Sequence, residues 1–293
     1  MTPRRRAGSL SFGRTGQPNR KPLRLNRGRT QVGSTTVRAK TVVFIHGMYM
    51  TPLCWEKWLD YFQAQGYRCL APAWPGRDRP IEELRRSGPD SPLSKLTLRD
   101  VLDHLTKTIQ ALDEKPVLIG HSMGGLAVQL LLQRDLAAAG VAIDSAPPQG
   151  VFTPAWSFIK SNWPHINPFA PQNQPISMTL ERFQYTFVNS LPAEQQQAAF
   201  DRYVVPESRR VPAQSLTSVA RIDFKRPHPP LLIIAGSADH IIPAALNRSN
   251  YARYQQSPSV TDFKEFAGRA HFIIGQANWE EVAGSILQWL QDK

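Results

Sequence analysis

The chain has 293 residues, 41% of them hydrophobic and 20% charged, which is enough to bury the core of a substantial globular domain. Its net charge is +12, but nine of the basic residues, and no acidic ones, lie in residues 1–30. The rest of the chain carries 26 basic and 23 acidic residues, a near-neutral balance that argues against a body built to bind nucleic acid. No apolar run reaches transmembrane length, and two cysteines, Cys54 and Cys69, cannot form a disulfide framework, so we expect a cytoplasmic protein without a transmembrane segment.

Residues 1–36 are rich in arginine, glycine and proline and poor in apolar side chains. This composition predicts a disordered, basic extension. Three interpretations of it remain open: a dispensable extension, an arm that touches anionic surfaces such as lipid or nucleic acid, and a targeting peptide.

The first predicted strand, Thr41–Ile45, is apolar and runs directly into His46-Gly47-Met48. A helix over 54–65, a strand over 67–71 and an amphipathic helix that starts after Thr97 follow it. Strand-like and helix-like stretches alternate in this way through most of the chain, which predicts an α/β fold with a mostly parallel sheet flanked by helices. The residues before the first predicted strand show little of the alternating pattern of a strand, so we expect the sheet to have few strands at that edge.

The most informative stretch is Gly120-His121-Ser122-Met123-Gly124, which lies between the apolar run 116–119 and the amphipathic run 126–132. A buried strand therefore turns into a helix with Ser122 at the apex. Glycines two residues before and after Ser122 leave room for a sharp turn, since a side chain at either position would collide with a neighbouring element. The hydroxyl then lies at a helix N-terminus, where amide groups stabilise developing negative charge. This context predicts a nucleophilic serine.

A serine nucleophile needs a base, and the base needs an orienting acid. The apolar run 230–235 ends in Gly236-Ser237-Ala238-Asp239, which places a carboxylate after a buried strand. His271 lies in a loop just ahead of the last amphipathic helix. In this order of serine, acid and histidine, and in the elements that carry them, the sequence resembles the α/β-hydrolase family over roughly residues 38–292.

The resemblance implies roles for five residues. Ser122 would be the nucleophile, Asp239 the orienting acid and His271 the general base. In this family the residue after the His-Gly pair and the residue after the nucleophile donate the backbone N–H groups of the oxyanion hole, which would be those of Met48 and Met123. No cofactor and no metal is implied, and the sequence has no cysteine or histidine cluster at zinc spacing.

Two of these assignments have rivals. In some hydrolases of this fold the acid follows the sixth strand, and Asp144, at the end of the strand-like run 141–144, has that position. His271 is preferred because it alone lies between the last predicted strand and the last helix. The other histidines are His46, His104, His121, His165, His228 and His240.

Residues 146–230 interrupt the alternation and are dense in proline and aromatic residues. A structureless loop of this length would be unusual in a compact domain. By the resemblance, we expect a helical cap, or lid, inserted after the sixth strand over the nucleophile, with helices at 180–191 and 193–203. The α/β core would then comprise residues 37–145 and 231–293. The suggested substrate-pocket residues are Met50, Trp74, Trp156 and Trp163.

The expected activity is two-step hydrolysis of a carboxylic ester of a hydrophobic small molecule, as in carboxylesterases and lipases. A serine at the apex of the turn argues against the activities of those family members that use an aspartate nucleophile at this position. Carbon–carbon bond hydrolases, lactonases and perhydrolases remain alternatives, because fold and triad do not separate these activities. A carbon–carbon bond hydrolase would need a cation for the acid end of its substrate, and Arg182 or Arg202 could provide it. A small-molecule receptor with incidental hydrolysis is a further alternative.

Overall fold

The structure is a computed structural model that describes residues 39–166, 169, 171 and 173–293. The predicted basic extension, residues 1–36, lies outside the described residues. Six parallel strands form a sheet in the order β2-β1-β3-β4-β5-β6, which confirms the predicted fold class. In the described part of the chain, no helix combines the length and the apolar character that a membrane span requires.

The central strands are short runs dominated by valine, isoleucine, leucine and alanine, and they are buried along their whole length. Such runs are typical of parallel strands covered by helices on both faces. The short strand β2 forms one edge of the sheet and is partly exposed. The strands are β1 (Thr41–Ile45), β2 (Arg68–Leu70), β3 (Val117–His121), β4 (Ala139–Ile143), β5 (Leu231–Gly236) and β6 (Thr261–Phe266).

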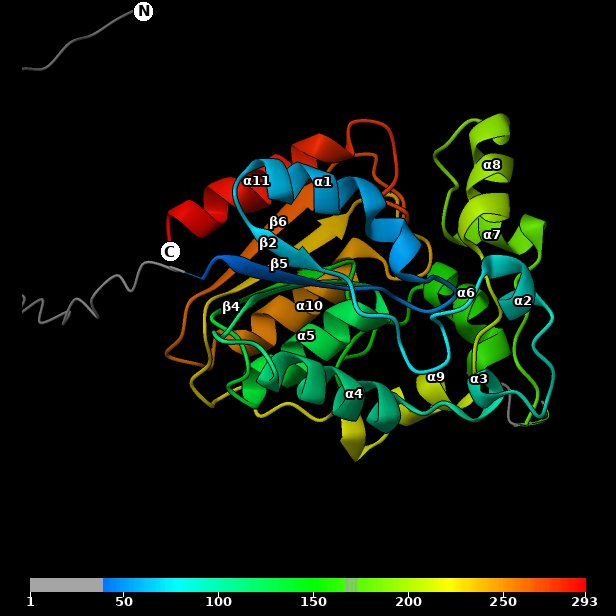
Figure 1. Cartoon of the computed structure of the whole chain (residues 1–293), viewed down its shortest axis with the longest axis horizontal. Helices are drawn as coiled ribbons and strands as arrows, with labels where there is room; N and C mark the ends of the chain where they lie inside the picture. The colour runs from blue at the N-terminus through cyan, green and yellow to red at the C-terminus, as the bar shows by residue number, and fades with distance from the viewer. Residues whose placement is uncertain (1–38, 167–168, 170, 172) are drawn as a thin grey trace, which may run out of the picture. The chain divides into compact units, whose positions relative to one another are not determined.

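Helices cover both faces of this sheet: α1 and α11 lie on one face, and α4, α5 and α10 lie on the other (Figure 1). The start of α4 shows how the sequence sets a helix boundary, because Thr97 and Asp100 cap it reciprocally as a capping box. The main helices are α1 (Glu56–Ala64), α4 (Leu98–Gln110), α5 (Met123–Gln133), α10 (Ala244–Tyr254) and α11 (Trp279–Gln291). Short helices are η1 (Pro52–Trp55), α2 (Ile81–Arg85), α3 (Pro92–Lys95) and η2 (Ser218–Ala220).

Residues 146–230 are here called the β4–β5 segment, and the described residues of this segment form four α-helices. The strand before the segment, expected as the sixth of the family's sheet, is the fourth along the described chain. The predicted helix 193–203 has the expected bounds, whereas the helix expected at 180–191 ends at Thr186, because the chain turns as Val188 N–H bonds back to the Phe183 carbonyl. The helices are α6 (Trp156–Ile166), α7 (Leu180–Thr186), α8 (Ala193–Tyr203) and α9 (Arg210–Ser215).

Strand β3 meets helix α5 in a turn that leaves no room for side chains at two positions. Ser122 adopts a φ of 59°, which non-glycine residues rarely do. A Cβ atom on Gly120 would lie 2.2 Å from the carbonyl oxygen of Gly124, and one on Gly124 would lie 2.2 Å from the carbonyl oxygen of Ile45. The collision expected from the sequence is therefore present on both sides of Ser122, and only glycine fits.

Gly120→Ala should lower the free energy of unfolding by about 3 kcal/mol or more, because its methyl group would overlap the backbone of α5 at Gly124. Backbone atoms within a helix can give way only if the helix itself shifts. Gly88→Ala is the matched control, since no atom lies within 4 Å of its Cβ position, and we expect a change within about 0.5 kcal/mol. Urea unfolding followed by circular dichroism measures both values. Equal stability of the two variants would contradict the described turn.

Candidate active site

Ser122 lies where β3 ends and α5 begins, at the carboxyl edge of the sheet. Its N–H donates to the Ile143 carbonyl and its own carbonyl accepts from the Ala146 N–H, both at 2.9 Å, so its backbone is held from two sides. Gly47 packs directly against it, because a Cβ atom on Gly47 would lie 2.8 Å from the Ser122 Cβ. The residue is 8% exposed, and that exposed surface faces a cavity.

Asp239 and His271 follow strands β5 and β6, which are neighbours in the sheet, and they meet at the same edge. His271 Nδ1 lies 2.6 Å from Asp239 Oδ2, and both side chains are fully buried. The other carboxylate oxygen, Oδ1, accepts from the N–H groups of Ile241 and Ile242, each at 2.8 Å. These contacts fix the carboxylate, and the carboxylate in turn fixes the plane of the imidazole.

The protonation of this pair leaves one imidazole nitrogen available. Burial lowers the pKa of His271, which keeps the ring neutral. Burial raises the pKa of Asp239, while the amides of Ile242 and Ile241 oppose that shift by donating to the charged carboxylate. With the imidazole proton on Nδ1 toward the carboxylate, Nε2 holds a lone pair, and it has no hydrogen-bond partner among the described residues. A neutral imidazole with a free Nε2 can accept a proton.

Asp144, the rival acid, lies close to the same histidine but bonds elsewhere. It is fully buried, and its Oδ1 accepts from the Gly236 N–H at 2.7 Å. Burial and the nearby charge of Asp239 raise the pKa of Asp144 well above its ordinary value. Because His271 is bonded to Asp239 and not to Asp144, the geometry favours Asp239 as the orienting acid.

His121, Asp144 and His271 form a cluster whose possible metal-ligand atoms lie within 4.8 Å of one another. His121 donates from Nε2 to the His271 carbonyl at 2.7 Å, and His271 uses Nδ1 to bind Asp239. Each histidine therefore has only one ring nitrogen left. A metal ion in this cluster would have to take the Nε2 of His271, the atom that could otherwise act as a base.

The N–H groups of Met48 and Met123 are suited to bind a negatively charged oxygen. Met48 follows Gly47, which packs on Ser122, and Met123 is the first residue of α5. Neither amide donates a hydrogen bond within the turns and loops of the described residues, and both residues line the same cavity as Ser122. The remaining donors at the N-terminus of α5 add to the local positive potential.

The cavity beside Ser122 has a volume of about 350 Å³ and a mostly apolar wall. Within the described residues, no aspartate, glutamate, lysine or arginine lines it. Its one histidine, His165, has its pKa lowered to about 3, mainly by burial and further by the charge of Arg182, so the ring is neutral. Its apolar lining includes Met48, Tyr49, Phe158, Phe187, Leu216 and Ile241.

The four pocket residues suggested from the sequence are not among the residues that line this cavity. Met50 and Trp74 are packed in the core, where Trp74 stacks on His46 at 4.5 Å, and Trp156 and Trp163 are 72% and 54% exposed. The two exposed tryptophans are seven residues apart and share the outer face of α6.

The pocket residues that the sequence reasoning missed on α6 lie on its other face. Phe158, Asn162 and His165 are spaced by four and three residues and line the cavity. That spacing was a usable signal. Arg182 and Arg202 also lie outside the cavity wall: Arg182 donates to the Ser161 carbonyl at 3.1 Å, and Arg202 pairs with Glu56 at 2.6 Å.

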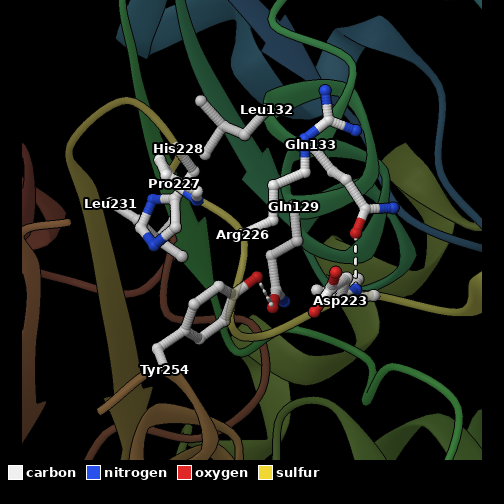
Figure 2. Close-up of a pocket in the computed structure, with 10 residues that line it drawn as sticks. Gln129, Leu132, Gln133, Asp223, Arg226, Pro227, His228, Leu231 and Tyr254 are labelled. Atoms are coloured by element: carbon white, nitrogen blue, oxygen red, sulfur yellow. Dashed lines mark hydrogen bonds between the residues drawn. The ribbon is translucent and has the colours of Figure 1, made fainter. Parts of the chain in front are cut away.

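A second hollow lies between α5 and the start of β5, and Figure 2 shows the side chains around it. Gln129 accepts there from the Tyr254 hydroxyl at 3.1 Å, and Gln133 accepts from the Asp223 N–H at 2.6 Å. Its volume is about 10 Å³, which holds about one water molecule. This hollow is too small for an organic substrate.

The model of a family described as "Alpha/beta hydrolase family" matches residues 42–285. Comparison with curated protein sequences gave no match. Among solved structures, the chain is similar to a monoacylglycerol lipase from Paleococcus ferrophilus, with 20% identity, a TM-score of 0.61 and coverage of 85% of this chain and 93% of that one.

Two further solved structures have the same fold. One is an extracellular alpha/beta-hydrolase from a Paenibacillus species, with 21% identity, a TM-score of 0.62 and coverage of 85% and 98% of the two chains. The other is the methylesterase MES16 from Arabidopsis, with 15% identity, a TM-score of 0.60 and coverage of 85% and 98%. At these identities the likeness shows the shared fold.

Proposed function

The chain belongs to the alpha/beta hydrolase family, and from that premise we propose that it is a serine hydrolase that cleaves carboxylic esters of uncharged, hydrophobic small molecules. The observation that carries the proposal is the 2.6 Å contact between His271 Nδ1 and Asp239 Oδ2. It leaves Nε2 of a neutral histidine free at the sheet edge where Ser122 faces an apolar cavity. A monoacylglycerol lipase and a methylesterase among the solved structures of this fold support an ester as the substrate.

In the first step, Nε2 of His271 takes the proton of the Ser122 hydroxyl while Oγ attacks the ester carbonyl carbon. His271 then gives that proton to the departing alcohol, and an acyl group remains on Ser122. In the second step, His271 takes a proton from water, the hydroxide attacks the acyl carbon, and the acid leaves as Ser122 regains its proton. Asp239 stabilises the imidazolium that forms in each step and holds the ring in place.

The carbonyl oxygen becomes negatively charged in both tetrahedral intermediates. The N–H groups of Met48 and Met123 would bind it there, and a fixed pair of amides beside an apolar cavity stabilises the charge more than the same donors would in solution. The side chains of the two methionines are not required for this. The alternative acid, Asp144, would support the fold of the loop through its contact with Gly236.

The β4–β5 segment is the cap of this hydrolase in our proposal. It contributes Phe158, Phe187 and Leu216 to the cavity wall, so it determines which substrates fit. The absence of lysine and arginine from the described wall leaves a substrate carboxylate without a partner. This favours an uncharged ester over the acidic substrate of a carbon–carbon bond hydrolase.

The enzyme should hydrolyse p-nitrophenyl butyrate, and Ser122→Ala should lower kcat by about 10⁴-fold or more because the nucleophile is lost. Mono-p-nitrophenyl succinate has a similar length but carries a carboxylate, and its kcat/KM should be about 100-fold lower than that of the butyrate ester. Release of p-nitrophenolate measures all of these rates. The exposed Ser249→Ala is the control variant and should retain wild-type rates.

Hydrolysis of the butyrate ester that persists in Ser122→Ala would refute the proposed nucleophile. Equal rates on the two esters would refute the preference for uncharged substrates while leaving the nucleophile in place.

Asp239→Asn should lower kcat by about 10³- to 10⁴-fold, because an amide cannot hold the Nδ1 proton and the histidine loses its tautomer. Asp144→Asn should stay within about tenfold of the wild type, since His271 makes no hydrogen bond to it. Both rates come from the same p-nitrophenyl butyrate assay. The reverse ranking of the two variants would assign the acid to Asp144.

A further inference from the structure

Tyr49 directly follows Met48, the residue whose N–H we assign to the oxyanion. Its φ is 63°, a left-handed conformation that is strained for a residue with a large side chain. A conformation of this kind persists only where the surroundings hold it. The direction of the Met48 N–H therefore depends on what fixes Tyr49.

All three polar groups of Tyr49 are held by the β4–β5 segment. Its N–H donates to Glu207 Oε2 at 3.1 Å, and its carbonyl accepts from the Val205 N–H at 3.0 Å. Its hydroxyl lies 2.6 Å from His165 Nε2. Because an Arg182 N–H, which can only donate, also faces that nitrogen at 3.4 Å, Nε2 is an acceptor and the Tyr49 hydroxyl donates.

Glu207 is itself immobilised. Its side chain is fully buried and pairs with Arg77 at 2.6 Å, and its Oε1 also accepts from the Ser208 N–H at 2.7 Å. Its backbone forms a bridge with Ile176 through a pair of hydrogen bonds. The partner of Glu207, Arg77, also binds the chain next to Tyr49, because its guanidinium donates to the Met50 carbonyl at 2.9 Å. One buried ion pair thus holds both the Tyr49 N–H and the carbonyl of the next residue, Met50.

We propose that Glu207 is a positioning residue for the oxyanion hole: it fixes the left-handed turn at Tyr49 and thereby holds the Met48 N–H toward Ser122. This inference rests on the proposed function. Glu207 touches neither substrate nor nucleophile and acts only through Tyr49. The cap therefore does more than shape the substrate cavity, since it completes the catalytic arrangement of the core.

The proposal predicts a specific kinetic pattern. The Met48 N–H binds the oxygen most strongly once that oxygen is negatively charged, and the contact of the Tyr49 hydroxyl with His165 keeps the Tyr49 ring in the cavity wall. A displaced backbone turn at Tyr49 should therefore weaken binding of the tetrahedral intermediate far more than binding of the ester. A loss of this kind lowers kcat and leaves KM unchanged. A defect of the cavity wall would instead raise KM.

Glu207→Gln tests the pattern with minimal change in shape. The two carboxylate oxygens accept from three N–H donors, from Tyr49, Ser208 and Arg77, whereas a glutamine has one acceptor oxygen and turns an NH₂ group toward at least one of them. We expect kcat for p-nitrophenyl butyrate to fall by about 10- to 100-fold with KM within about twofold. Glu56→Gln is the matched control, because it breaks the exposed Glu56–Arg202 pair that also joins the core to the β4–β5 segment, and it should have wild-type kinetics.

A pair of inhibitors separates positioning from a general loss of structure. A trifluoromethyl ketone forms a tetrahedral adduct with an oxyanion, and its inhibition constant should rise in Glu207→Gln by about the same factor as kcat falls. The matching methyl ketone, which binds without forming a stable adduct, should keep its inhibition constant. Equal weakening of both inhibitors, or an unchanged kcat, would overturn the proposal.

If Glu207→Gln does not fold, the double variant Arg77→Met/Glu207→Leu replaces it, because apolar residues of similar volume often substitute for a buried ion pair without loss of stability. This variant also removes the acceptor of the Tyr49 N–H and should show the same fall in kcat at an unchanged melting temperature. A folded double variant with wild-type kcat would overturn the proposal. A wild-type protein that hydrolyses no ester would instead refute the proposed function, so the two failures are distinguishable.

Discussion

The closest approach between β1, β3 and α5 is the constraint on which the rest of the site depends. The carbonyl of Gly124 lies so near Gly120, and that of Ile45 so near Gly124, that not even a methyl group fits between them. This contact forces Ser122 into a positive φ and projects its side chain beyond the sheet edge. The parallel pairing of β4, β5 and β6 then brings the residues after each strand to the same edge, which is why Asp239 and His271 meet there although they are 32 residues apart.

The candidate site combines residues that follow the core strands with residues of one inserted segment. Ser122, Asp239 and His271 follow core strands, whereas the β4–β5 segment lines much of the cavity and binds Tyr49 beside the proposed oxyanion amide. A fully buried pair, Arg77 and Glu207, joins the two parts, and its charges are tolerated because each oxygen and most N–H groups have partners. In the proposed function, substrate selection and the geometry of catalysis are therefore linked through the same segment.

The fold could be predicted from the sequence because local patterns and the global arrangement agree. Buried strands, Gly120 before Ser122 and the Thr97 cap depend on neighbours close in the chain, and these predictions are confirmed. The cavity wall could not be predicted in the same way. Whether Trp156 or Phe158 faces the cavity depends on how α6 is rotated against the core. The hydrogen bond between the Tyr49 N–H and Glu207 joins residues that are 158 positions apart. Neither fact leaves a signal in a single sequence beyond the spacing of Phe158, Asn162 and His165.

The central claim is that Ser122 is a nucleophile activated by His271. The most direct test is to treat the wild type, Ser122→Ala and His271→Gln with a fluorophosphonate that carries an alkyl chain, and to locate the adduct by peptide mass spectrometry. The account predicts one adduct per wild-type chain on the peptide that contains Ser122, none on Ser122→Ala, and labelling slowed by about 10³-fold or more in His271→Gln. An adduct on another residue, or equally fast labelling without His271, would contradict it.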